Sequence, residues 1–223
     1  MSLLLAGLTV LVIGDSHIAY VEHTDFLITT LHDELMQRGA AVYSYGACGA
    51  KPVDLLNGMK VPFCGFTFRF NDGKIRLRQP DLGPTMSLSE LVGKFHPNLI
   101  VVVSSDTMAN YKEPAMNKAW VSSEVAALTR GIKATGASCV WVGPTWGTEG
   151  GKYGKTYAKA QILSDYLSGI VSPCTYIDSL KMAKPGEWGT LDGMHLDSNG
   201  YQRWGSAIAN EIVTSDILQK IRQ

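Results

Sequence analysis

The chain has 223 residues, enough for one medium-sized domain with a substantial hydrophobic core. Its 20 lysine and arginine residues balance 20 aspartate and glutamate residues, so no basic surplus is available to bind a phosphate backbone, and nucleic acid is not an expected partner. No apolar run approaches the roughly 20 residues that a membrane helix needs, so we expect a soluble chain without a membrane span.

Strand-like and helix-like segments alternate along the chain. Apolar runs predict five strands, at residues 8–14, 40–46, 98–105, 137–144 and 174–178. Helical periodicity and end signals predict helices at 23–39, 115–134, 155–171 and from about 198 to the C-terminus. This alternation predicts a single α/β domain over 1–223, built on an open, five-stranded parallel sheet.

One segment breaks the alternation. Residues 66–78 alternate apolar and polar side chains around Asn71-Asp72-Gly73, which is a β-hairpin signal. We expect this hairpin to be an insertion that packs beside the sheet and forms one wall of the site.

The four cysteines show no CxxC spacing, so no zinc site is expected. Cys139 lies in an apolar strand and is interpreted as a small core residue. Cys48 and Cys64 lie in glycine-containing loops, and both a disulfide and two free thiols fit that context. A disulfide would indicate an oxidising compartment.

The opening MSLLLAGLTV is too short for an intact signal peptide and lacks a basic flank. The expected location is therefore the periplasm or the exterior if a leader was removed, and the cytoplasm otherwise. The oligomeric state is not predicted.

Reactive side chains follow the strands. The first strand ends in Gly14-Asp15-Ser16-His17, and Asp192 precedes His195 by three residues. In a parallel sheet the loops after the strands share one edge, where ligands bind. An imidazole oriented by Asp192 could take the proton of Ser16 as the hydroxyl attacks a carbonyl. Taken singly, each motif also fits a plain helix cap or surface turn.

Two motifs together resemble one family. VLVIGDSH (10–17) is similar to the GDS(L) block of the SGNH or GDSL-type esterases and lipases, and LDGMHLDSNGY (191–201) to their closing DxxH block. The resemblance implies a flavodoxin-like, three-layer α/β/α fold and no cofactor or metal. It also implies that Ser16 is the nucleophile, His195 the general base and Asp192 the acid that orients it.

The same resemblance assigns the oxyanion hole. Beside the Ser16 backbone, Gly49 matches the glycine of the second family block, with Gly46 as the rival. The third block departs from the family pattern G-x-N-D, because SSDTMAN places Thr107 where the family has asparagine. Either Thr107 substitutes as the donor or the loop brings Asn110 into its place.

The remaining polar and aromatic residues near the predicted edge have weaker assignments. Asp15 is expected to hold the nucleophile turn and His17 to line the pocket. Trp146, like Trp188 and Tyr153, could stack on a sugar ring or simply pack its loop. The three other histidines are expected at the surface: His23, His32 and His96.

The favoured function is a serine esterase that hydrolyses an ester, foremost an O-acetyl group on a carbohydrate. The alternatives are an O-acyltransferase with a sugar acceptor and a non-catalytic carbohydrate-binding relative. A nucleotide-binding function fits poorly, because neither GxxxxGK[ST] nor GxGxxG is present.

Overall fold

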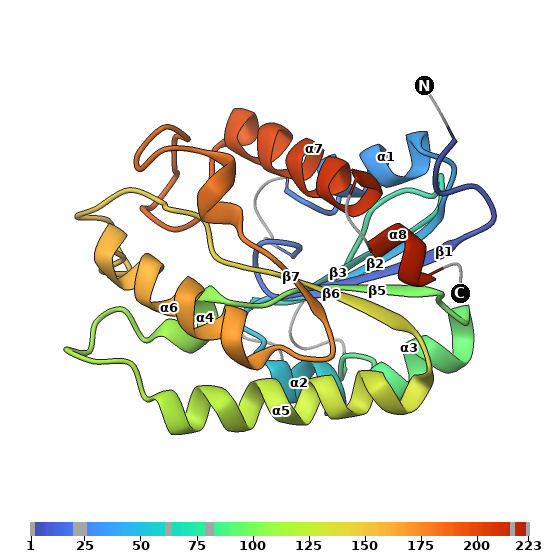
Figure 1. The fold of residues 1–223 in the computed structure, drawn as a ribbon, viewed down its shortest axis with the longest axis horizontal. Helices are drawn as coiled ribbons and strands as arrows, with labels where there is room; N and C mark the ends of the chain where they lie inside the picture. Colours follow the sequence, from blue (N-terminus) through green and yellow to red (C-terminus); the bar gives the residue numbers. More distant parts are fainter. Residues whose placement is uncertain (1–2, 20–25, 61–63, 79–82, 215–216, 222–223) are drawn as a thin grey trace.

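The computed structural model describes residues 3–19, 26–60, 64–78, 83–214 and 217–221, and its centre is one sheet with helices on both faces (Figure 1). The sheet has seven strands in the order β4-β3-β2-β1-β5-β6-β7. The strands are β1 (Thr9–Gly14), β2 (Ala41–Ala47), β3 (Phe66–Phe70), β4 (Arg76–Arg78), β5 (Leu99–Val103), β6 (Ser138–Val142) and β7 (Thr175–Ile177).

Two hydrophobic layers enclose the sheet. One face packs on α1 and α7, and the other packs on α2, α3, α5 and α6. The helices are α1 (Thr30–Gln37), α2 (Pro52–Asn57), α3 (Leu88–Phe95), α4 (Asp106–Ala109), α5 (Lys118–Thr135), α6 (Tyr157–Ile170), α7 (Ser198–Thr214) and α8 (Ile217–Ile221), with a 3₁₀ turn at Ser179–Met182. Alternate residues of β1 supply the two layers: Val10 and Val12 belong to the first, Leu11 and Ile13 to the second.

The predicted five-stranded parallel sheet needs a correction, because the sheet is seven-stranded and mixed. Strands β2, β1, β5, β6 and β7 do pair in parallel, in the order of a flavodoxin-like sheet. The hairpin at 66–78 does not lie beside this sheet but extends it, because β3 pairs with β2 in antiparallel orientation. The pairing satisfies the backbone groups on the outer edge of β2, which would otherwise be exposed.

Other differences lie at helix ends and in short helices. The helix expected over 23–39 begins at Thr30, after a turn over 26–29, and residues 20–25 lie outside the described part. The last predicted helix is divided into α7 and α8. Helix α3 was not predicted, although Ser87 and Glu90 form a capping box at its start.

Both cysteine pairs form disulfides. The Cys48–Cys64 bond links the loop after β2 to Cys64, two residues before β3 begins. Cys139 is buried as expected, but it is bonded to Cys174, so its interpretation as a simple core thiol is wrong. The bond is possible because β6 and β7 are neighbours, which brings the two Cα atoms within 4.6 Å.

The surface expectation for His32 is also wrong, whereas His96 is exposed and His23 lies outside the described residues. His32 is fully buried: Nδ1 lies 2.8 Å from the Ser44 hydroxyl and Nε2 lies 2.9 Å from the Asn71 carbonyl oxygen. Both contacts are satisfied when the neutral ring donates from Nε2. His32 therefore ties α1 to β2 and to the turn of the hairpin.

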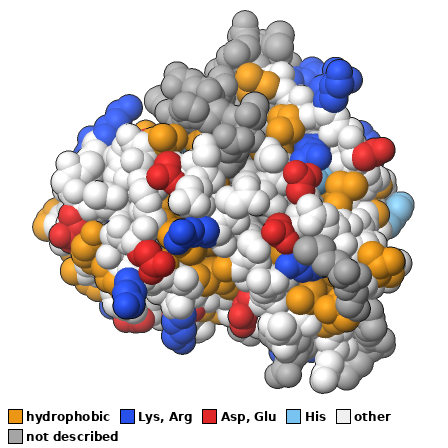
Figure 2. Space-filling model, turned by 90° about the horizontal axis from the view of Figure 1, so that it is seen from above, with side chains coloured by type: hydrophobic (Ala, Val, Ile, Leu, Met, Phe, Trp, Pro, Cys, Tyr) orange, Lys and Arg blue, Asp and Glu red, His pale blue; other side chains and the backbone are white. Residues whose placement is uncertain are grey.

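The outer face of α1 and α7 carries acidic and basic side chains mixed together (Figure 2). None of the helices in the described part of the chain combines the length and the apolar character needed to cross a lipid bilayer.

Candidate active site

The loop after β1 forms a tight turn that exposes Ser16 at the carboxyl edge of the sheet. The backbone N–H groups of Ile18 and Ala19 both donate to the Asp15 carbonyl oxygen, at 3.0 Å each. The Asp15 carboxylate is completely buried beneath the turn and accepts the His17 N–H at 3.0 Å. Burial raises the pKa of Asp15. Asp15 thus braces the turn from below and is not among the residues that line the pocket.

Ser16, His195 and Asp192 form a continuous chain of hydrogen bonds. His195 Nε2 lies 2.8 Å from Ser16 Oγ, and His195 Nδ1 lies 2.7 Å from Asp192 Oδ2. The other carboxylate oxygen of Asp192 accepts the backbone N–H groups of Met194 and His195, at 3.0 and 2.8 Å. The three-residue spacing therefore closes a small turn that fixes the carboxylate against the ring.

The electrostatics of this turn favour an ionised Asp192. Burial alone would raise the pKa of the carboxyl group, but the hydrogen bonds from the His195 ring and from the two backbone N–H groups outweigh it and lower the pKa to about 2. A carboxylate opposite Nδ1 keeps the proton on that nitrogen and leaves Nε2 free to accept the Ser16 proton.

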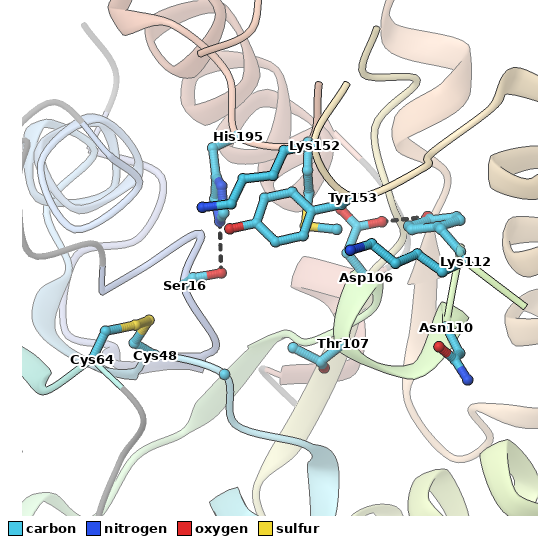
Figure 3. Close-up of a pocket in the computed structure, with 13 residues that line it drawn as sticks. Ser16, Cys48, Cys64, Asp106, Thr107, Asn110, Lys112, Lys152, Tyr153 and His195 are labelled. Carbon is cyan, nitrogen blue, oxygen red and sulfur yellow. Dashed lines mark hydrogen bonds between the residues drawn. A yellow bond between two sulfur atoms is a disulfide. The ribbon is translucent and has the colours of Figure 1, made fainter. Parts of the chain in front are cut away.

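Ser16 opens into a pocket of about 410 Å³ (Figure 3). The pocket is lined by loops that follow β1, β2, β5 and β6 and by the segment around His195. The lining residues are Ser16, Cys48, Gly49, Cys64, Asp106, Thr107, Asn110, Tyr111, Lys112, Lys152, Tyr153, Met194 and His195. A pocket of this size holds a small ester with part of its alcohol group.

Ser16 and Gly49, whose backbone N–H groups are the predicted oxyanion donors, line the same pocket. Gly49 has a φ of +78°, a conformation that favours glycine, and the neighbouring Cys48–Cys64 disulfide clamps its loop. No hydrogen bond within the described residues uses the backbone N–H of Ser16 or of Gly49. These two groups remain available to a bound oxygen atom.

The two side chains considered for a third donor lie differently. Thr107 lines the pocket, but its Oγ1 is buried and has no hydrogen-bond partner among the described residues. The amide of Asn110 is at the far end of the pocket and points away from Ser16 (Figure 3). In this conformation neither side chain offers a donor to an atom bound at Ser16.

A buried charged network lies behind the pocket, and sequence reasoning did not find it. Both Asp106 oxygens are 2.8 Å from Lys155 Nζ, and Asp106 Oδ2 is 2.9 Å from His17 Nε2. The Tyr111 hydroxyl also donates to Asp106, and His17 Nδ1 lies 2.8 Å from the Tyr201 hydroxyl. Burial alone would raise the pKa of Asp106, but the charge of Lys155 and the contact with His17 hold it well below its usual range.

His17 does not line the pocket, although the sequence suggested that it would, and neither does Trp146, for which stacking on a sugar and packing of its loop were both considered. His17 is turned into this buried network, because its ring bridges Asp106 and Tyr201. The Trp146 indole N–H donates to the carbonyl oxygens of Leu180 and Ala183, at 2.9 and 2.8 Å, so this side chain packs its loop.

Of the other two aromatic residues considered for sugar stacking, Trp188 is in the core, whereas Tyr153 lines the pocket with its ring edge-on to His195.

The topology predicts the position of three further pocket residues at the site but does not predict their roles. Tyr111 and Lys112 lie in the loop after β5, and Lys152 lies in the loop after β6. Because ligands bind beyond the carboxyl ends of parallel strands, these residues could have been predicted to lie near the site. No local signal marks Lys155 as buried, since lysine is seldom buried without a partner and its partner is 49 residues away.

No protein-family model matches the chain. The chain is 39% identical over 224 residues to protein BcsX of Komagataeibacter xylinus, covering 100% of this chain and 82% of BcsX.

Several solved structures are similar in fold at much lower identity. A Slackia heliotrinireducens protein described as an SGNH hydrolase has a TM-score of 0.58 at 17% identity, covering 91% of this chain and 97% of that one. Esterase EstA from Pseudoalteromonas has a TM-score of 0.57 at 13% identity, covering 92% and 96%. The acetylxylan esterase Axe2 from Geobacillus stearothermophilus has a TM-score of 0.56 at 13% identity, covering 93% and 94%. The chain therefore belongs to the same family as BcsX, and it has the SGNH/GDSL-hydrolase fold that the sequence resemblance predicts.

Proposed function

We propose that the protein is a serine hydrolase that cleaves carboxylic esters. The observation that supports this most directly is the hydrogen-bonded chain from Ser16 through His195 to Asp192 at the mouth of a pocket. In this proposal Ser16 is the nucleophile, His195 the general base and Asp192 the residue that fixes the imidazole tautomer.

The reaction would proceed in two halves. As Ser16 Oγ attacks the ester carbonyl carbon, its proton passes to His195 Nε2. The carbonyl oxygen becomes an oxyanion that accepts the N–H groups of Ser16 and Gly49. Collapse of the tetrahedral intermediate expels the alcohol, which takes the proton from His195. Water then attacks the acyl-serine with His195 again as base, and the carboxylic acid leaves.

For the substrate we propose an O-acyl group on a carbohydrate, with acetyl as the simplest case. Tyr153 at the pocket edge offers a ring and a hydroxyl to a sugar. An acetylxylan esterase and an acetyl-xylooligosaccharide esterase are among the proteins of similar fold. A sugar hydroxyl in place of water in the second half would turn the same intermediate into an acyltransferase reaction.

Labelling with a fluorophosphonate probe tests the nucleophile. We expect wild-type protein to react and Ser16→Ala to remain unlabelled, whereas Ser168→Ala, which removes an exposed hydroxyl of α6, should react like wild type. Folding of each variant is checked by circular dichroism. A folded wild-type protein that resists labelling would support the non-catalytic binding alternative instead.

Acetate release from an acetylated xylo-oligosaccharide then tests the substrate, with and without a free sugar acceptor. Release that does not depend on the acceptor supports hydrolysis. Transfer to the acceptor at the expense of release supports the acyltransferase.

A further inference from the structure

The pocket beside Ser16 contains two lysines that the proposed ester chemistry does not require. Lys112 lies in the loop after β5 and Lys152 in the loop after β6, and both line the pocket. Figure 3 draws both among the side chains that line the pocket, and the Lys152 ammonium group lies over the Tyr153 ring, 5.5 Å from its centroid. Neither forms an ion pair with a described residue.

No free carboxylate in the described pocket lining balances these charges. Asp106 is the one acidic lining residue, and Lys155, His17 and Tyr111 already occupy both of its oxygens. Asp192 faces the other nitrogen of His195 and does not line the pocket. The pocket is therefore positively charged within a chain whose formal net charge is +0.

The loop that carries Lys152 is held firmly against the Asp192 turn. Lys152 donates its backbone N–H to the Asp192 carbonyl oxygen at 2.9 Å, and Thr148 donates to the Gly193 carbonyl oxygen at 2.9 Å. A Cβ atom on Gly151 would approach the Asp192 carbonyl oxygen to 2.5 Å, so only glycine permits this contact. The ammonium group of Lys152 thus extends from a backbone fixed beside the reacting groups.

Lys112 is also carried by an anchored segment. The Lys159 ammonium group donates to the carbonyl oxygens of Tyr111 and Glu113, on either side of Lys112. Tyr153 adds a neutral donor between the two lysines, since burial raises the pKa of its hydroxyl and the nearby Asp192 charge adds to this effect. Its hydroxyl points toward the Ser16 side of the pocket (Figure 3).

We infer that the substrate is an anionic ester, whose carboxylate is bound by the ammonium groups of Lys112 and Lys152 while Ser16 attacks the ester carbonyl. This inference rests on the proposed function and narrows its substrate class. Both lysines are exposed, so a plain acetyl ester of a neutral alcohol would leave Lys112 to solvent and Lys152 to solvent and the face of the Tyr153 ring. A charged ester would instead give both ammonium groups short, charge-assisted hydrogen bonds. The charge can lie on the acyl group, as in a half-ester of a dicarboxylic acid with a sugar hydroxyl, or on the alcohol, as in an O-acyl ester of an acidic sugar, which is a hydroxy acid.

Two substrate pairs distinguish these sources. For the acyl side, mono-4-nitrophenyl adipate is compared with its methyl ester, which is neutral. For the alcohol side, 4-acetoxybenzoate is compared with methyl 4-acetoxybenzoate. The ratio of kcat/KM for the anionic and the neutral member is measured in wild type, Lys112→Met, Lys152→Met and Lys133→Met. Comparing ratios between variants removes the intrinsic reactivity of each ester.

We expect the ratio for one pair to fall by about tenfold or more in Lys152→Met or Lys112→Met, the loss typical of a hydrogen bond to a charged group. The wild-type ratio should also fall as salt is added. Lys133→Met is the matched control, because this exposed lysine lies at the end of α5 that leads into β6, at the opposite edge of the sheet. Its ratio should equal that of wild type.

Unchanged ratios for both pairs in both lysine variants, with esters still hydrolysed, would overturn the inference and leave the esterase proposal intact. Absence of all turnover and of Ser16 labelling would instead reject the esterase proposal. In that case the anion site can still be tested by binding alone. NMR titration measures the affinity of the Ser16→Ala variant for monomethyl adipate, an anion, and for dimethyl adipate, which is neutral. The inference requires that the anion binds more tightly than the neutral ester, and that its affinity falls by about tenfold or more when Lys152→Met or Lys112→Met is added. Equal affinity for the two esters would overturn it.

Discussion

His195 Nε2 lies 2.8 Å from Ser16 Oγ, although 179 residues separate the two in the chain. The contact exists because β1 is central in the sheet and the Asp192–His195 turn comes back over its carboxyl end just before α7. The roles of His195 and Ser16 in this contact can be tested by replacing the residues around them.

Replacing Asp192 by Asn should leave the fold intact and reduce kcat sharply, on the order of 10⁴-fold, the effect of the same change in a serine-protease triad. The amide can no longer hold the proton on Nδ1, so Nε2 cannot act as base. Turnover of 4-nitrophenyl acetate measures the loss, and Asp165→Asn, at an exposed position of α6, serves as control. A loss below tenfold would show that Asp192 does not orient the ring.

The low pKa of Asp192 fixes the direction of its pH effect. With a pKa lowered to about 2 in the folded protein, the carboxylate stays ionised as the pH falls past 3.8, the ordinary pKa of an aspartate. Its contribution to stability is therefore present above that value and is lost only as the pH falls toward 2.

Thr107→Val should change turnover little. The Thr107 hydroxyl is buried without a described partner, so its removal takes nothing from a ligand at Ser16 and relieves an unsatisfied polar atom. Loss of a working oxyanion donor costs about 10²–10³-fold in kcat. A loss of that size in Thr107→Val would show that the side chain rotates into the pocket during the reaction and acts as the third donor.

Asp106→Asn should destabilise the protein by about 3–5 kcal/mol, because it leaves the Lys155 ammonium group buried opposite a neutral partner. Urea unfolding measures the loss. The double variant Asp106→Asn/Lys155→Met should lose less than the sum of the two single variants. The pair of the exposed Lys181 with Asp178 is the control, and Lys181→Met should cost less than about 1 kcal/mol.

His32 should make the protein sensitive to mild acid. Burial lowers its pKa to about 4 from 6.5, so the unfolded chain binds this proton more readily than the folded one. Stability is therefore complete above pH 6.5 and falls as the pH drops toward 4, by up to about 2 kcal/mol between pH 7 and 5. Urea unfolding at both pH values should show this difference in wild type and a smaller one in His32→Gln.

The two disulfides should differ in their effect on activity. Removing Cys48–Cys64 by double serine substitution should cost about 3 kcal/mol, and removing Cys139–Cys174, which closes a longer loop, about 4 kcal/mol. Only the first lines the pocket and adjoins Gly49, so only its loss should also lower kcat at temperatures where both variants are folded. Equal turnover in the two variants would contradict a role for the Cys48–Cys64 bond in holding Gly49.

The sequence predicts the parallel strands and most of the helices of this protein well, but it predicts poorly which side chains contact one another. The parallel strands were found because fully buried strands such as Leu99–Val103 are apolar throughout. The edge pairing of the hairpin and the Cys139–Cys174 bond were missed, since both depend on which strands are neighbours.

At the site, Ser16, Asp192 and His195 could be predicted because they lie in recognisable motifs. The ion pair of Asp106 with Lys155 could not be predicted. The two residues are 49 positions apart in the chain, and no sequence motif connects them.

The separation of Ser16 and His195 along the chain has a consequence for biosynthesis. The Ser16 hydroxyl emerges from the ribosome 179 residues before the His195 imidazole, and the turn that holds the imidazole leads directly into α7. In the proposed mechanism, a nascent chain that lacks this turn and α7 has the nucleophile without its base, so reactivity requires the segment from Asp192 through α7 to be made and docked.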